Sequence, residues 1–159
     1  MLNNSFNAVE VLEMAKDIEE RGYDFYQSQA KISNDDELKQ LFLKLAEDEQ
    51  DHYQRFNNLI KNVDKVTRED AEYVYEPEVS AYLEALVEFS IFPDSSEMNI
   101  ENVKDALRMA IYAEKDSILF YQEMLKNNQG ETADVVKQLI KEEKKHLLEL
   151  IRYSDEIVV

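Results

Sequence analysis

Two short stretches decide the fold, LAEDEQDH at residues 45–52 and LIKEEKKH at residues 139–146. Each places a glutamate three residues before a histidine, and these are the two histidines of the whole chain. Residues three apart in a helix lie on one face, so each Glu-x-x-His motif presents a carboxylate and an imidazole together. Apolar residues recur around both motifs in steps of three and four, which predicts amphipathic α-helices.

The same periodicity extends outward from these motifs. It predicts four long helices, near residues 6–31, 36–61, 101–127 and 132–154. Asn34 or Asp35 is expected to cap the second helix, because short polar side chains accept hydrogen bonds from free N–H groups at helix starts. Asn99 is likewise expected to cap the third helix, and Thr132 the fourth. With only two glycines and two prolines, the chain has few residues for strands and tight turns, so the fold class is predicted to be all-α.

The connections between these helices predict the topology. Only a few residues separate the first helix from the second, and the third from the fourth, which makes each pair an antiparallel hairpin. The chain is therefore predicted to be one domain, residues 1–159, with a hairpin at 6–61, a crossover at 62–100 and a hairpin at 101–154. A short helix, SAYLEALVEFSIF, is expected within the crossover. The result is an antiparallel four-helix bundle.

The two hairpins also resemble each other in sequence. AKDIEERGYDFY at residues 15–26 aligns with AIYAEKDSILFY at 110–121, and the two Glu-x-x-His motifs align at nearly the same displacement, about 95 residues. This indicates an internal duplication with pseudo-twofold symmetry. Each hairpin alone would leave an apolar face open, so the two are expected to close on each other.

Ionisable residues interrupt the apolar stripe of every predicted helix, at one level of the bundle. They are Glu19, Glu49, His52, Glu114, Glu143 and His146. Burying four unpaired carboxylates would be prohibitively costly, and no lysine or arginine lies near them on these stripes. Two divalent cations would balance the four negative charges, and two neutral imidazoles would complete the ligand set. Such oxygen-rich ligation suits iron or manganese, and it matches the known pattern of ferritin-like di-iron bundles.

Composition excludes several other functions. A net charge of −17 disfavours nucleic acid and anionic membranes as partners. The absence of cysteine rules out disulfides, thiolate metal sites and a catalytic thiol within this chain. With neither a basic leader nor a long apolar segment, the expected location is the cytoplasm and no membrane association is expected.

At these residues the chain resembles the ferritin-like superfamily, and specifically its rubrerythrin-like branch. EERGYDFYQSQAK and ELKQLFLKLAEDEQDHYQRF carry the resemblance, which covers both hairpins. It implies two bound iron ions, with manganese or mixed metal as alternatives, and redox chemistry with hydrogen peroxide or dioxygen. It also implies that Glu49 and Glu143 bridge the metals while the other four residues are terminal ligands.

The sequence departs from typical rubrerythrins in two respects. It lacks the four cysteines of a rubredoxin domain, so a separate protein is expected to donate electrons. It also has Ser117 where they carry an additional ligand glutamate. The family resemblance further implies a homodimer, for which the crossover offers apolar residues. These are Leu83, Leu86, Phe89 and Phe92.

Several readings stay open at this level. Tyr26 and Tyr121 follow Glu19 and Glu114 by seven residues. They either donate hydrogen bonds or electrons near the metals, or are core tyrosines with satisfied hydroxyls. Glu20 and Glu142 adjoin predicted ligands and are interpreted as surface residues, because neighbours on a helix point apart. The functional alternatives are an oxidoreductase, an iron-sequestering protein without turnover, and a structural bundle without redox chemistry.

Overall fold

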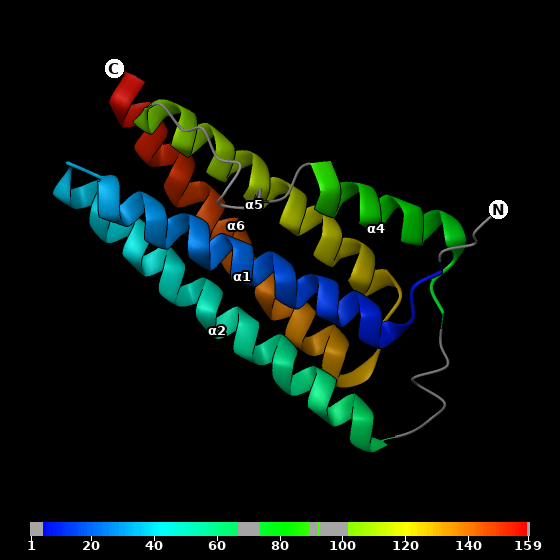
Figure 1. Ribbon diagram of the computed structural model, residues 1–159. Coiled ribbons are helices and arrows are strands. Elements are labelled where there is room, and N and C mark those ends of the chain that lie inside the picture. Colours follow the sequence, from blue (N-terminus) through cyan, green and yellow to red (C-terminus); the bar gives the residue numbers. More distant parts are fainter. Residues whose placement is uncertain (1–4, 67–73, 90–91, 93–101, 159) are drawn as a thin grey trace.

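The computed structural model describes residues 5–66, 74–89, 92 and 102–158. Its helices are α1 (Ala8–Ile32), α2 (Asp36–Val66), α4 (Pro77–Phe89), α5 (Val103–Lys126) and α6 (Gly130–Val158). The four long helices form an elongated bundle, and the shorter α4 lies along α5 (Figure 1). The described part of the chain contains no strand. The all-α prediction and the four-helix bundle are confirmed.

The helix ends agree with the prediction in part. Asp35 caps α2, accepting a 2.9 Å hydrogen bond from the Leu38 amide. The cap of α5 is Asn102, which accepts from the Asp105 amide at 2.9 Å. The prediction of Asn99 was therefore wrong, and that residue lies outside the described ranges.

Two other predicted boundaries also shift. Thr132 lies inside α6 rather than before it, because the helix begins two residues earlier at Gly130, whose φ of 67° is a conformation that favours glycine. The crossover helix begins at Pro77, three residues earlier than expected, since proline is favoured at the first helical position. The second helix runs on to Val66, so the crossover is shorter than the predicted 62–100.

The crossover is tied to the start of the chain as well as to α5. The Tyr75 amide donates to the carbonyl of Phe6 at 2.8 Å, and the Phe6 amide donates to Oγ of Ser80 at 3.1 Å. These bonds hold the beginning of α4 against the beginning of α1. The described part of the crossover therefore follows the bundle closely, as Figure 1 shows.

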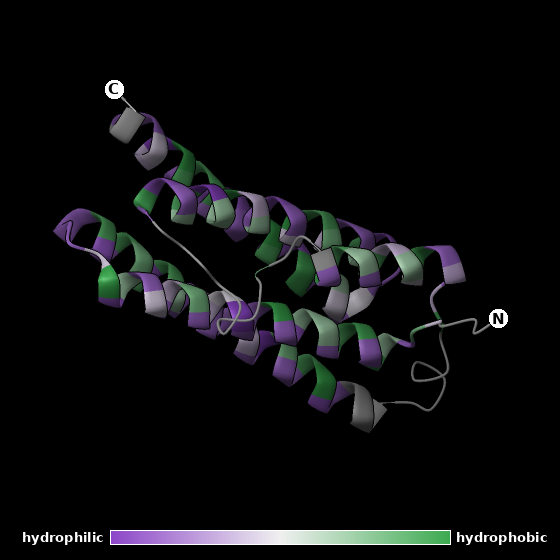
Figure 2. Ribbon diagram, turned by 45° about the horizontal axis from the view of Figure 1, so that its top comes forward, coloured by the Kyte–Doolittle hydropathy of each residue, from purple (hydrophilic) through white to green (hydrophobic). Residues whose placement is uncertain are grey.

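The core follows the predicted stripes, with apolar residues turned inward (Figure 2). The periodicity of the third predicted helix also assigns Val103 to its apolar stripe, but this residue is 41% exposed because it is the first residue of α5. Ala8 and Tyr153, at the ends of their helices, are only half-buried. Leu83, Leu86 and Phe92 are buried in the chain's own core. Among the described residues, no helix is both long and apolar enough to cross a lipid bilayer.

Candidate metal centre

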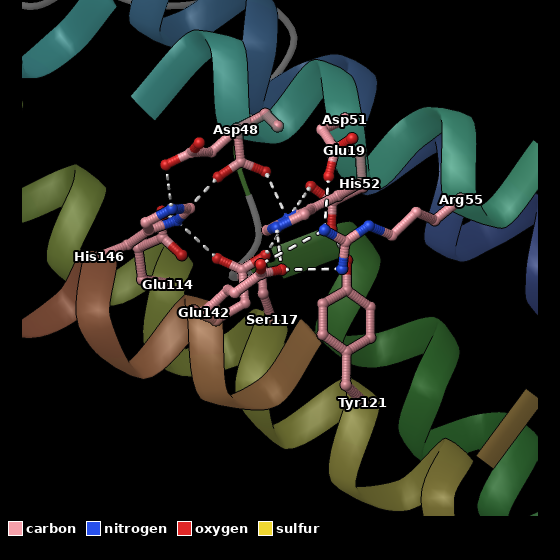
Figure 3. Close-up of polar contacts among 12 residues, drawn as sticks. Glu19, Asp48, Asp51, His52, Arg55, Glu114, Ser117, Tyr121, Glu142 and His146 are labelled. Atoms are coloured by element: carbon pink, nitrogen blue, oxygen red, sulfur yellow. Dashed lines mark hydrogen bonds and ion pairs between the residues drawn. The ribbon is translucent and has the colours of Figure 1, made fainter. Parts of the chain in front are cut away.

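The structure brings all six predicted ligands together in the middle of the bundle (Figure 3). Glu19 comes from α1 and Glu114 from α5, whereas α2 and α6 each supply a Glu-x-x-His motif. None of the six is more than 3% exposed. Equal distances from the two hairpin turns place them at one level, as the sequence predicts.

Both imidazoles turn the same ring atom toward the centre. The Nδ1 atom of His52 lies 3.0 Å from Oε1 of Glu143 and 3.4 Å from Oε2 of Glu19. The Nδ1 atom of His146 lies 2.9 Å from Oε2 of Glu143 and 3.4 Å from Oε1 of Glu49. The rings are stacked, with centroids 5.6 Å apart. A lone pair on Nδ1 would repel carboxylates this close, so a proton or another cation must lie between them.

The donor atoms form two overlapping groups, and the atoms within each group lie within 4.8 Å of one another. One group contains Glu19 and His52, the other Glu114 and His146, and both contain Glu49 and Glu143. Two buried oxygens, Oε2 of Glu19 and Oε1 of Glu49, have no hydrogen-bond partner among the described residues, and an imidazole Nδ1 lies 3.4 Å from each. Orphaned buried carboxylate oxygens are costly. The residues therefore fit two divalent cations that share two carboxylates.

Two buried tyrosines hold the carboxylates that the two groups do not share. Tyr26 on α1 donates to Oε1 of Glu114 on α5 at 2.5 Å. Tyr121 on α5 donates to Oε1 of Glu19 on α1. The pairing is reciprocal, as the internal repeat requires. Both readings of these tyrosines therefore hold in part: their hydroxyls are satisfied, and the groups that satisfy them are predicted ligands.

The outer nitrogen of each histidine also meets a carboxylate from the opposite hairpin. Nε2 of His146 lies 3.0 Å from Oδ2 of Asp48, and Nε2 of His52 lies 3.0 Å from Oε2 of Glu142. An Nε2–H that donates to a carboxylate fixes the tautomer and leaves Nδ1 free to bind a metal. The interpretation of Glu142 as a surface residue was therefore wrong, whereas Glu20 is exposed as predicted.

Comparison with known proteins identifies the family. The family model described as rubrerythrin matches residues 10–152. The chain belongs to the rubrerythrin family. A crystal structure from Thermotoga maritima, assigned as a ferritin-like diiron-carboxylate protein, is similar over 96% of this chain and 97% of that one. Its TM-score is 0.76 and the sequences are 27% identical. No curated protein matches the chain significantly.

These matches confirm the resemblance on which the sequence interpretation rests. The rubrerythrin family, the diiron-carboxylate relative and the buried cluster together support a di-metal protein. The match covers nearly the full length of both chains, so the similarity is not confined to one hairpin.

Burial opposes ionisation of all four inner carboxylates, but the pKa is raised only at Glu49 and Glu114, whereas the neighbouring imidazoles and hydrogen bonds outweigh burial and lower the pKa of Glu19 and Glu143. Burial raises the pKa of Glu49 well above its ordinary value, and the charges of Glu143 and Glu19 raise it further. Burial and the charge of Glu143 raise the pKa of Glu114 to about 8. The protein groups alone therefore favour a proton on both of these carboxyls. Divalent cations would replace those protons.

The histidines respond in the opposite way to burial. Burial by itself lowers the pKa of His52, but the nearby charges of Glu143 and Glu19 outweigh it and raise the pKa. Burial likewise lowers the pKa of His146, and the carboxylates around it, Asp48 included, raise it. The hydrogen bond from His52 lowers the pKa of Glu142 to about 2, so this outer carboxylate stays ionised.

Sequence reasoning missed the outer carboxylates Asp48 and Glu142. A signal was present, because each directly precedes the glutamate of its Glu-x-x-His motif, and the two positions align in the internal repeat. Helical geometry sends these side chains away from their own glutamates. That direction is toward the neighbouring helix rather than toward water, which only the packing of α2 against α6 reveals.

Proposed function

We propose that this rubrerythrin binds two iron ions at the buried cluster and uses them to reduce hydrogen peroxide or dioxygen. The observation that carries the proposal is the pair of overlapping donor groups that share Glu49 and Glu143. Each group offers one imidazole and three carboxylates, a donor set that favours iron or manganese over softer metals. Four carboxylates balance two divalent ions without further charge.

In this proposal the six buried residues are the ligands, and each has a defined part. Glu49 and Glu143 would be shared by both metals, Glu19 and His52 would hold one of them, and Glu114 and His146 would hold the other. When bound, a ferrous pair supplies two electrons, which with two protons reduce one hydrogen peroxide to two waters.

The chain's own groups prepare this centre. The tyrosine hydroxyls of Tyr26 and Tyr121 each occupy one oxygen of a terminal carboxylate, which leaves the other oxygen for a metal. Asp48 and Glu142 orient the imidazoles through Nε2. The surrounding core excludes bulk water, which strengthens each of these interactions.

Reductant, assembly and location also remain proposals. Because the chain contains no cysteine, we expect a separate protein to return electrons to the centre, in the cytoplasm. A homodimer is expected from the family resemblance alone. Leu83, Leu86 and Phe92 are buried within the chain, so they cannot also form a dimer surface, and the side chain of Phe89 is not described.

Iron counting tests the proposal against its rivals. The metal-free protein is loaded with ferrous iron under anaerobic conditions, and bound iron is measured per chain. About two per chain is the expected result, whereas hundreds per assembly would indicate storage, and none would leave a structural bundle. Adding peroxide to the loaded protein should then oxidise two irons per peroxide, followed by the near-ultraviolet absorption of ferric iron.

Ligand variants test the assignment of positions. His146→Ala removes a ligand of one metal only, so it should weaken one of the two binding steps. Glu143→Ala removes a shared carboxylate and should weaken both. Glu20→Ala, an exposed neighbour of Glu19, is the matched control and should load two irons. If this control lost its metal while Glu143→Ala kept two irons, the proposed ligand set would be wrong.

A further inference from the structure

The two outer carboxylates of the candidate metal centre are not equivalent (Figure 3). Glu142, which accepts from His52, also accepts from both guanidinium nitrogens of Arg55: Nη1 lies 3.0 Å from Oε2 and Nη2 lies 3.3 Å from Oε1. Asp51 holds Arg55 from the other side, with Oδ2 at 2.7 Å from Nη2. The carboxylate behind His52 is thus paired with a guanidinium, which it shares with Asp51.

The carboxylate at the outer nitrogen of His146 has different neighbours. Asp48 accepts from its Nε2, and Lys44, one turn earlier on α2, donates instead to Oε1 of Glu149 at 2.8 Å. The Lys44 side chain is 58% exposed, so its charge acts on Asp48 through a largely aqueous path. Asp48 therefore keeps more of its negative charge for the imidazole than Glu142 does.

We propose that Arg55 makes the two metal positions unequal, so that the position completed by His146 binds a divalent cation more tightly and fills first. This inference rests on the proposed di-metal function. A carboxylate that accepts the outer N–H of a histidine increases the donor strength of the inner nitrogen. Arg55 takes up both oxygens of Glu142 and weakens that effect at His52.

The charge of Arg55 acts in the same direction. A guanidinium placed behind His52 repels a cation bound on the other side of the ring, and no such group contacts the carboxylate behind His146 among the described residues. The two shared carboxylates, Glu49 and Glu143, contribute to both positions and cancel in the comparison. Arg55 therefore adds a difference between the two positions that comes from outside the ligand set.

Arg55 also holds Glu142 in place against His52. This positional effect should strengthen metal binding at the His52 position, whereas the positive charge of Arg55 should weaken it. Arg55→Gln separates the two, because the glutamine amide can still donate to Glu142 while the positive charge is gone. Arg21→Gln is the matched control. Arg21 pairs with Asp17 at 2.9 Å, and its side chain is 33% exposed against 32% for Arg55.

The experiment titrates the metal-free full-length protein with Mn²⁺ and follows binding by calorimetry. Mn²⁺ is the probe because it prefers the same oxygen and imidazole ligands as ferrous iron without being oxidised during the titration. The native chain should show two steps of unequal affinity. His146→Ala should abolish the tighter step and His52→Ala the weaker one.

Arg55→Gln should then tighten the weaker step about tenfold and leave the tighter step unchanged, whereas Arg21→Gln should change neither. Two steps of equal affinity in the native chain would overturn the inference and leave the di-metal centre intact. So would a weaker second step in Arg55→Gln, which would make Arg55 a positional residue only. Absence of Mn²⁺ binding would overturn both the inference and the proposed centre.

Discussion

Asp48 and His146 join the two hairpins of the bundle across the metal centre: Oδ2 of Asp48 on α2 lies 3.0 Å from Nε2 of His146 on α6. Glu142 on α6 meets His52 on α2 at the same distance. Each hairpin thus supplies the carboxylate that orients the other hairpin's imidazole. The internal repeat builds one site from two halves, and neither half contains a complete position.

The first prediction follows from this exchange. Asp48→Asn should weaken the metal position of His146, and Glu142→Gln the position of His52, each by about ten- to a hundredfold, because the imidazole loses its outer acceptor. Calorimetric titration with Mn²⁺ measures both steps. Glu47→Gln, an exposed neighbour of Asp48, is the control and should bind as the native chain does. Equal weakening of both steps by Asp48→Asn would contradict the crossed arrangement.

The second prediction concerns the tyrosine hydroxyls. Tyr121→Phe leaves Oε1 of Glu19 without its donor in a buried place, which should lower the free energy of unfolding by about 1–3 kcal/mol. Urea unfolding of the metal-free protein measures the change. Tyr82→Phe removes a hydroxyl from a side chain that is 41% exposed and should stay within about 0.5 kcal/mol of the native value. A Tyr121→Phe variant as stable as Tyr82→Phe would refute the structural role of this bond.

The sequence was sufficient to predict the buried cluster because its residues violate the apolar pattern. Glu19 and Glu114 interrupt stripes that are otherwise apolar, and only a compensated buried site makes that acceptable. Helix lengths and short turns then fix the height of each residue. The gathering of these six residues was therefore predictable from the pattern, whereas the expectation that Glu49 and Glu143 are shared came from the family resemblance.

The outer groups could not be predicted by the same reasoning. Asp48, Glu142 and Arg55 lie on the polar sides of their helices, where charged residues are usual and carry no signal. Their roles depend on the rotation of α2 against α6, which periodicity does not determine. Helix starts at Asn102 and Gly130 were missed for a related reason, since several polar residues near each turn could serve as caps.

The third prediction concerns Gly22, which lies one turn after Glu19 on the buried face of α1. A Cβ at this position would lie 3.1 Å from Cε2 of Phe92 and 3.3 Å from both Cδ and Oε2 of Glu49. Alanine in a helix interior normally gains up to about 1 kcal/mol over glycine, but here these contacts oppose the gain. Gly22→Ala should therefore lose affinity for metal, because the carboxylate of Glu49 must shift.

A second substitution identifies which contact matters. Phe92→Leu in the Gly22→Ala background relieves the contact with the ring and leaves the contact with Glu49. Metal affinity should stay low in this double variant, as measured by Mn²⁺ titration. Full recovery would assign the defect to Phe92 rather than to Glu49, and an unaffected Gly22→Ala variant would show that the backbone accommodates the methyl group.

The fourth prediction is a pH dependence of stability in the metal-free protein. The pKa of Glu114 is raised to about 8, so its contribution to stability is fully present below its ordinary pKa and is lost as pH rises toward 8. His52 and His146 also have raised pKa values, so the stability that they contribute is likewise lost as pH rises above the ordinary pKa of histidine. The stability that comes from the lowered pKa of Glu142 is lost only in acid, as pH falls below the ordinary pKa of a glutamate.

The melting temperature of the metal-free protein should therefore fall between pH 6 and pH 8. The metal-loaded protein should change much less, because coordinated groups carry no protons to lose. Thermal melts with and without a chelator at pH 6, 7 and 8 test this. Glu114→Gln removes one titrating group and should reduce the slope of the chelated sample. A metal-free melting temperature that rises across this range would contradict the proposed proton occupancy.

The last prediction counts the protons that metal binding displaces. The raised pKa values favour a proton on Glu49 and on Glu114, and the raised pKa values of His52 and His146 favour cationic rings. Two divalent ions need four ionised carboxylates and two neutral imidazoles. Filling both positions should therefore release about four protons per chain. Calorimetry with Mn²⁺ in buffers of different ionisation enthalpy measures this number directly.

His146→Ala, which lacks one of these protons and one ligand, should release fewer. Release of fewer than two protons by the native chain would mean that the carboxylates are already ionised and the imidazoles already neutral at pH 7. The negative charge of the cluster would then be balanced by something other than these protons.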